Sequence, residues 1–126
     1  MSMRISNSEL EVLNVLWAAG TPLHRGGILE NSKDKTWKDS YIHILLNKML
    51  EKGLIQEAGF TRSGKVWARL YAPALTMEEY YAATLPAGAF DPATMVREIL
   101  KRDDVDGETL DELQALLDQA RAEKEN

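Results

Sequence analysis

Cysteine is absent from this chain of 126 residues, and histidine occurs only twice. Without cysteine the chain has no disulfide, no thiol nucleophile and no thiolate metal site. No run of about 18 apolar residues occurs, so the sequence predicts no membrane insertion. The first residues contain no apolar segment of signal-peptide length, so we expect no targeting signal. Together these absences favour a protein of the cytoplasm.

Residues that could support catalysis or bind a metal are also scarce. His24 and His43 have no third ligand in view, so they predict no metal site. The sequence contains no His-Glu-x-x-His motif and no glycine-rich phosphate loop. Asp103 and Asp104 fall in an expected loop, where solvation explains the two carboxylates better than acid–base catalysis. We therefore expect neither an enzyme nor a cofactor.

The net charge of −5 is divided unequally along the chain. Residues 1–73 contain 10 Lys and Arg against 7 Asp and Glu, a net charge of +3. Residues 74–126 contain 5 against 13, a net charge of −8. A basic N-terminal half and an acidic C-terminal half are expected when only the N-terminal half approaches the phosphates of a nucleic acid. The alternative is that the acidic C-terminal half only favours solubility.

The first half of the chain carries the signals of three helices. Ser6 and Glu9 have the spacing of a capping box, so a first helix should cover residues 7–19. A weaker second helix is expected around residues 24–31, where two glycines each cost about 1 kcal/mol. A third helix should cover roughly residues 38–52. It has an apolar stripe and ends before a glycine: Ile42, Leu45, Leu46, Met49, Leu50 and Gly53.

Two strands and a turn are expected after the third helix. Residues 54–60 and 65–71 are extended in character, and the second stretch alternates with a period of two. Ser63-Gly64 is the expected turn, and Pro73 closes the unit. Three helices followed by a hairpin with a basic tip are typical of a winged helix-turn-helix.

The rest of the chain is helical and acidic. Helices are expected over residues 77–85 and 91–102 and from residue 106 onward, the second beginning at Asp91-Pro92. These helices are too short and too separated to close a core in one copy, so we expect a homodimer. The expected dimerisation residues are Leu110, Leu113, Leu116 and Leu117. The alternative is that these helices fold back on their own winged domain.

The predicted fold class is therefore mainly α with a small β-hairpin (α+β). Residues 1–73 are expected to form a winged-helix DNA-binding domain, and residues 74–126 a helical dimerisation domain. The third helix would turn its apolar stripe inward and its opposite face to DNA. With the wing tip, the candidate DNA-binding residues are Lys38, Ser40, Tyr41, His43, Ile44, Asn47, Lys48, Arg62 and Lys65.

Each candidate has a chemical reason. Ser40 and Tyr41 can bond phosphate or base, Asn47 suits adenine, and Ile44 could touch a thymine methyl. The lysines, together with Arg62, would neutralise phosphates. The opposing interpretations are that Tyr41 is a half-buried packing residue, that His43 is an ordinary surface histidine, and that the lysines form a solvated face.

The chain resembles the penicillinase/methicillinase repressor family over nearly its whole length. Residues 5–17 resemble the family's opening helix. The family's helix-turn-helix is matched by Thr36, Trp37, Ile42, Leu46 and the segment Lys52-Gly53-Leu54-Ile55. Tyr71-Ala-Pro73 is similar to the wing exit, and residues 95–113 to the dimerisation helices. The resemblance implies a dimeric repressor that blocks transcription from a palindromic operator in double-stranded DNA. It also implies a membrane-bound β-lactam sensor that triggers cleavage of the repressor, and control of β-lactam resistance or related stress genes.

Three departures from the family pattern bear on these expectations. Glu98-Ile99 stands where the family has its cleaved Asn-Phe bond, which argues against induction by cleavage. The third helix begins Lys38-Asp39-Ser40-Tyr41 where the family shows Ser-Pro-Lys-Thr, so the operator sequence does not carry over. The wing is longer by about two residues, within residues 61–65. Without cysteine, the chain cannot belong to the copper-responsive branch. The alternative function is a winged-helix protein-interaction module, because the fold does not require DNA.

Overall fold

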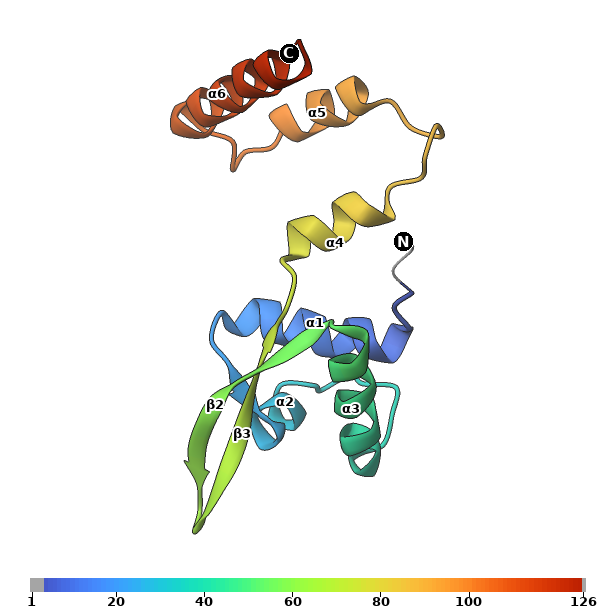
Figure 1. The fold of residues 1–126 in the computed structure, drawn as a ribbon, viewed down its shortest axis with the longest axis vertical. Helices are drawn as coiled ribbons and strands as arrows, with labels where there is room; N and C mark the ends of the chain where they lie inside the picture. The colour runs from blue at the N-terminus through green and yellow to red at the C-terminus, as the bar shows by residue number, and fades with distance from the viewer. Residues whose placement is uncertain (1–3, 126) are drawn as a thin grey trace. The chain divides into compact units, whose positions relative to one another are not determined.

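Six α-helices, one short 3₁₀ helix and three strands make up residues 4–125, the part of the chain described by a computed structural model (Figure 1). In chain order they are α1 (Asn7–Ala19), β1 (Leu23–His24), α2 (Arg25–Glu30), the 3₁₀ helix η1 (Asp39–Tyr41), α3 (Ile42–Lys52), β2 (Ile55–Ser63), β3 (Val66–Pro73), α4 (Met77–Thr84), α5 (Pro92–Leu100) and α6 (Gly107–Lys124). This confirms the predicted fold class. Within residues 4–125 no helix is both long and apolar enough to cross a membrane.

Helix α1 begins and ends where the sequence predicts. The Ser6 hydroxyl accepts a hydrogen bond from the Glu9 amide at 3.2 Å, and the Glu9 carboxylate accepts one from the Ser6 amide at 2.8 Å. This capping box satisfies two amides that would have no partner inside the helix. At the other end Gly20 adopts a left-handed φ of 70° and bonds back to the Leu16 carbonyl.

The core of the N-terminal unit lies where α1, α2 and α3 meet the start of β2. The apolar stripe predicted for α3 is buried as expected. The buried apolar residues are Val12, Leu13, Leu16, Ile28, Ile42, Leu45, Leu46, Met49, Leu54 and Ile55. With its apolar residues turned inward, α3 presents the other side to solvent.

The sheet has three strands in the order β1-β3-β2, one more than predicted. Strand β1 pairs antiparallel with β3, with Leu23 opposite Tyr71. Two residues are too few to show an alternating pattern, so the sequence placed this segment at the start of the second helix. Strands β2 and β3 form the wing, a hairpin that projects beyond the helices in Figure 1. It is longer than predicted, and its turn is Gly64-Lys65 rather than Ser63-Gly64.

The helix predicted over residues 38–52 begins with a tighter turn. Residues Asp39–Tyr41 form the 3₁₀ helix, in which the Tyr41 amide donates to the Lys38 carbonyl at 2.9 Å. No side chain caps this turn, and 3₁₀ geometry is common where an α-helix starts. Helix α3 ends at Gly53, whose φ of 74° confirms the predicted stop.

The chain divides into two compact units, between Thr84 and Leu85. The sequence places the domain boundary after Pro73, whereas in the structure α4 groups with the first unit. The Trp17 indole donates to the Leu75 carbonyl at 2.9 Å, and the rings of Trp17 and Tyr80 lie 5.8 Å apart. These contacts join residues far apart in sequence, so no local sequence pattern predicts them.

The second unit contains α5 and α6, each capped by an aspartate. Asp91 accepts from the Thr94 amide at 3.2 Å and Asp106 from the Thr109 amide at 2.9 Å. Asp91 also accepts from the Thr94 hydroxyl at 2.7 Å. The hydrogen bonds from the Thr94 hydroxyl and amide lower the pKa of Asp91 below its ordinary value, and the hydrogen bond from the Thr109 amide lowers that of Asp106. Helix α5 ends at Leu100, slightly earlier than predicted. Among the described residues from Leu85 onward no side chain is buried.

Candidate nucleic-acid interface

The side of α3 opposite the core is exposed as predicted. Its outer face, continued from η1, consists of Ser40, Ile44, Asn47, Lys48 and Glu51. Ile44 is 51% exposed, which is unusual for an isoleucine in a helix whose other aliphatic residues are buried or half-buried. An apolar group held out of the core among polar neighbours is suited to touch another molecule, such as a thymine methyl.

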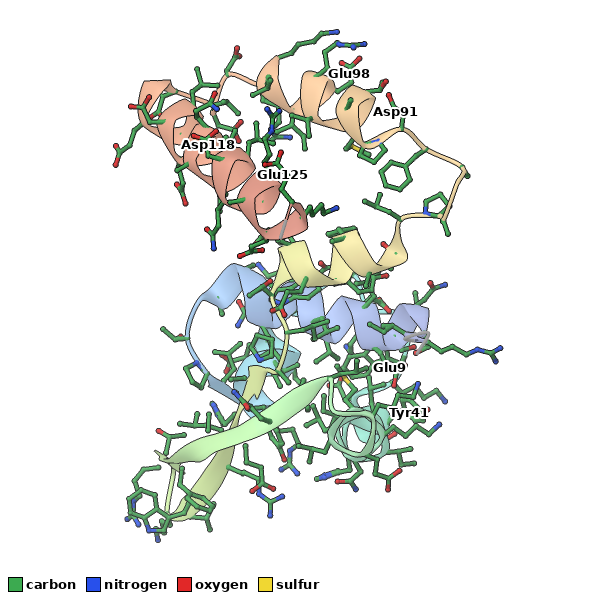
Figure 2. The ribbon with its side chains drawn as sticks, turned by 45° about the horizontal axis from the view of Figure 1, so that its top comes forward. Glu9, Tyr41, Asp91, Glu98, Asp118 and Glu125 are labelled. Atoms are coloured by element: carbon green, nitrogen blue, oxygen red, sulfur yellow. The ribbon has the colours of Figure 1, made fainter. Side chains whose placement is uncertain are left out.

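Tyr41 lies half-buried at the start of α3 (Figure 2). Its ring packs against the core, while its hydroxyl accepts a hydrogen bond from the Lys48 ammonium at 3.2 Å. The same ammonium lies 5.8 Å from the centre of the Tyr41 ring. Tyr41 therefore packs and also holds Lys48 over the outer face, which restricts where that positive charge can lie.

His43 is exposed and faces the start of α2. The Nη1 atom of Arg25 lies 2.6 Å from Nε2 of His43. The same Nη1 atom lies 3.2 Å from Nδ1 of His43, so the guanidinium lies against the imidazole ring close to both of its nitrogens. The pair links α2 to α3 at the edge of the outer face and brings a fixed positive charge there. Arg25 is not among the candidates from the sequence, since the contact joins residues 18 positions apart.

The wing brings further cations beside exposed aromatic rings. Arg62 and Lys65 are exposed near the hairpin tip, where they were expected. The guanidinium carbon of Arg62 lies 5.2 Å from the centre of the Trp67 ring. Trp67 is 65% exposed, and Phe60 on the other strand 64%. The alternation of residues in the second strand is visible in the sequence, but the exposure of these two rings is not.

Carboxylates near these cations are mostly paired. The Asp39 carboxylate lies 2.7 Å from the Lys35 ammonium, and Glu57 lies 2.7 Å from Arg69. Lys38 is exposed next to Asp39 at the start of η1. The outer face of α3 thus carries one acidic side chain, Glu51, in the last turn of the helix. The surface has the composition expected for phosphate contact along its first turns and its wing.

The residues expected to mediate dimerisation lie on α6. Leu110, Leu116 and Leu117 are 47%, 54% and 60% exposed, and Leu113 is half-buried. Helix α5 exposes four more large apolar residues: Met95, Val96, Ile99 and Leu100. Glu98, which precedes Ile99, is also exposed and is paired with Lys101 at 3.1 Å.

No group of three metal-ligating side chains is gathered anywhere in residues 4–125. The chemistry that the N-terminal unit offers is recognition: hydrogen-bonding groups on a protruding helix, cations at its edges, and a hairpin beside it. These are the groups with which helix-turn-helix proteins contact bases and phosphates.

Comparison with known proteins agrees with this geometry. The family described as "Penicillinase repressor" matches residues 5–119. The chain is also 27% identical, over 133 aligned positions, to the penicillinase repressor of Bacillus licheniformis. The alignment covers 96% of this chain and 94% of that protein, so it includes both units.

Proposed function

The chain belongs to the penicillinase repressor family, and from this premise we propose that it binds a palindromic operator as a homodimer. Its membership makes it a DNA-binding transcriptional repressor and not an enzyme. The observation that supports operator binding best is the outer face of η1 and α3, where Ser40, Ile44 and Asn47 are all exposed while the opposite side of α3 is buried in the core.

In this proposal α3 enters the major groove. Asn47 and Ile44 meet base edges, while Ser40 and Tyr41 bond phosphate or base. His43 lies at the edge of this face, beside Arg25. Lys38 and Lys48 neutralise phosphates on one side of the helix, and Arg62 and Lys65 do so from the wing. As a DNA-binding repressor, the protein would act in the cytoplasm.

The homodimer is supported by the apolar surface of the second unit. In one copy none of its described residues is buried, although α5 and α6 expose seven large apolar side chains. Short helices without a buried face are not stable alone in water. A second copy that covers the stripe of Leu110, Leu113, Leu116 and Leu117 would provide the missing core.

The inducing mechanism is a separate question. The relative's name indicates a penicillinase gene as its target, and we propose a β-lactam resistance gene or a related stress gene for this chain. We do not extend the proposal to a membrane-bound sensor protease, because Glu98-Ile99 replaces the Asn-Phe bond expected from the family resemblance. Transcript levels in a strain lacking the protein would identify the target genes.

Operator binding is tested with the DNA fragment that lies directly upstream of the protein's own gene. Affinity should fall linearly with salt on a log–log scale and exceed the affinity for an unrelated fragment by at least about a thousandfold. Binding that depends on neither salt nor sequence would instead favour the protein-interaction module.

The roles of individual residues are tested by two variants. The double substitution Arg62→Ala and Lys65→Ala should weaken binding to all fragments alike and reduce the salt slope. Asn47→Ala should change the preference between fragments, because it removes a contact to a base edge. If both variants lose the same affinity on every fragment, the assignment of Asn47 to base reading is wrong.

Dimerisation is tested in the full chain by light scattering. Leu113→Lys with Leu117→Lys places two charges in the apolar stripe and should give a monomer. Asp111→Lys with Asp118→Lys introduces the same side chains on the opposite side of α6 and should remain dimeric. A dimer in the first variant would exclude this stripe as the interface.

A further inference from the structure

A cleft lies between the wing and the outer face of α3, within the N-terminal unit, and encloses about 590 Å³. One wall comes from the helices and includes Arg25, His43 and Asn47; the other comes from the strands and includes Phe60, Trp67 and Arg69. We call this the wing cleft. Of these residues only His43 and Asn47 were candidates from the sequence, so the second wall is unexplained.

The aromatic residues of this wall do not contribute to the hydrophobic core. Phe60 is 64% and Trp67 65% exposed, and neither belongs to the hydrophobic core or to the side chains packed against it. Two large rings left in water on a hairpin give up most of the free energy that their burial would contribute. Exposed aromatic residues of this kind mark a surface that another molecule covers.

The register of the strands alternates aromatic and basic residues on one face. Trp67 is opposite Arg62, and Phe60 is opposite Arg69. Since residues two apart in a strand share a face, all four side chains project from the same side of the ribbon. The Arg62 guanidinium is held over the Trp67 ring at 5.2 Å.

The charge of the cleft selects the class of ligand. Arg25 stands on the helical wall and Arg62 beside the other, whereas Arg69 is paired with Glu57 at 2.7 Å. A ligand that suits both the cations and the rings must alternate anionic and apolar groups. The sugar–phosphate strand of a DNA duplex does so, because each deoxyribose presents C–H groups between two phosphates.

We propose that the wing cleft holds one sugar–phosphate strand of the duplex that α3 reads. Trp67 and Phe60 pack against its deoxyribose rings, and Arg25 and Arg62 bond its phosphates. This inference rests on the proposed function and adds to it three contact residues on the walls, Arg25, Phe60 and Trp67. It also means that part of the wing's contribution to the binding free energy comes from apolar contacts, and that this part does not depend on salt.

The first test measures binding of the full chain to the fragment upstream of its own gene. Trp67→Ala should weaken binding about tenfold, the loss expected when roughly 60 Å² of apolar surface no longer leaves water. The slope of log affinity against log salt should not change. Arg62→Ala should reduce that slope by about one for each protomer. Trp67→Phe, which keeps an aromatic ring, should retain most of the affinity.

A second measurement needs no variant that could misfold. Trp67 is the exposed tryptophan of the chain, whereas Trp17 and Trp37 are half-buried. Acrylamide should therefore quench mainly Trp67, and DNA binding should protect it. The same titration with Trp67→Phe gives the background from the other two. Tyr81→Ala removes another exposed aromatic ring, on α4 outside the cleft, and should leave the affinity unchanged.

The outcomes separate this inference from the proposed function. If the unaltered chain binds the fragment but DNA leaves the quenching of Trp67 unchanged and Trp67→Ala binds normally, the cleft does not hold the strand, although operator binding stands. If Trp67→Ala changes the oligomeric state but not the DNA affinity, a second copy fills the cleft and the inference is wrong. If the unaltered chain binds no DNA, both proposals fail.

Discussion

Replacement of Lys52 by methionine should destabilise the N-terminal unit strongly at neutral pH and weakly in acid. The reason is its partner, Glu9, which is 1% exposed at the start of α1 (Figure 2). One oxygen of the Glu9 carboxylate accepts from the Ser6 amide and from the Lys52 ammonium, both at 2.8 Å. The other oxygen has no hydrogen-bond partner among the described residues. Without the ammonium, the buried carboxylate would accept a single hydrogen bond, from the Ser6 amide.

The size of the loss follows from how deeply the pair is buried. Removing one partner of a fully buried ion pair costs about 3–5 kcal/mol, because the other charge is left uncompensated. The Lys52 side chain is 43% exposed, so water can partly replace it and the cost is reduced. We expect a decrease of about 1–3 kcal/mol in the free energy of unfolding at pH 7. For a domain of this size that corresponds to a Tm lower by roughly 5–15 °C.

The pH dependence has a definite sign. Burial raises the pKa of Glu9, but hydrogen bonds from Lys52 and Ser6 outweigh it and hold the pKa below the ordinary value. A depressed pKa adds stability above the pKa of the unfolded chain, and that stability is lost as the pH falls through the folded pKa. Without Lys52, fewer hydrogen bonds oppose the effect of burial, so the pKa of Glu9 should rise. Protonation of Glu9 in acid should then remove the uncompensated buried charge and restore part of the variant's stability. The difference in stability should therefore be largest near pH 7 and shrink below about pH 5.

The assay is denaturant unfolding followed by circular dichroism at several pH values. Lys48→Met is the matched control, since it removes an exposed lysine of the same helix whose partner is the uncharged Tyr41 side chain, at 3.2 Å from its hydroxyl. Its effect should stay within about 0.5 kcal/mol. The reasoning is refuted if Lys52→Met is as stable as this control at pH 7, or if its deficit is the same at every pH.

Three further substitutions test the local structure. Ser6→Ala removes the cap of α1 and should lower the free energy of unfolding by about 1 kcal/mol in urea titrations; no change would mean that the capping box contributes nothing. Gly53→Ala forces a side chain into a left-handed φ of 74° and should cost about 1–2 kcal/mol in thermal unfolding, whereas Gly107→Ala, with an ordinary φ and free space, should cost less. Trp17→Phe loses the hydrogen bond to the Leu75 carbonyl and should speed amide hydrogen exchange in α4. Unchanged exchange would mean that this bond does not stabilise α4 against α1.

The sequence predicted the elements whose signals are local. The capping box of α1, the apolar stripe of α3, the glycine after it and the aspartate cap of α5 each depend on residues a few positions apart, and all are present. The exposure of Ser40, Ile44 and Asn47 followed from the same periodicity, because the stripe on one side of a helix determines what lies on the other.

The features that the sequence did not predict depend on distant contacts. Strand β1 exists because Leu23 pairs with Tyr71, and α4 joins the first unit because Trp17 bonds Leu75. Arg25 reaches His43 across the turn between two helices. The period of two in the wing showed that Trp67 alternates with its neighbours, but it could not show that no other element covers that ring.

The division of the structure after Thr84 changes how the charge of the protein must be interpreted. With α4 included, residues 1–84 contain 10 Lys and Arg against 9 Asp and Glu, a net charge of only +1, and residues 85–126 contain 5 against 11, a net charge of −6. The total charge of the N-terminal unit thus gives little support to DNA binding. Support comes instead from the local arrangement, in which Asp39, Glu57 and Glu9 are each paired with a lysine or arginine. Attraction to phosphate depends on the local field more than on the sum of charges, so the salt dependence of binding should follow the cations around α3 and the wing.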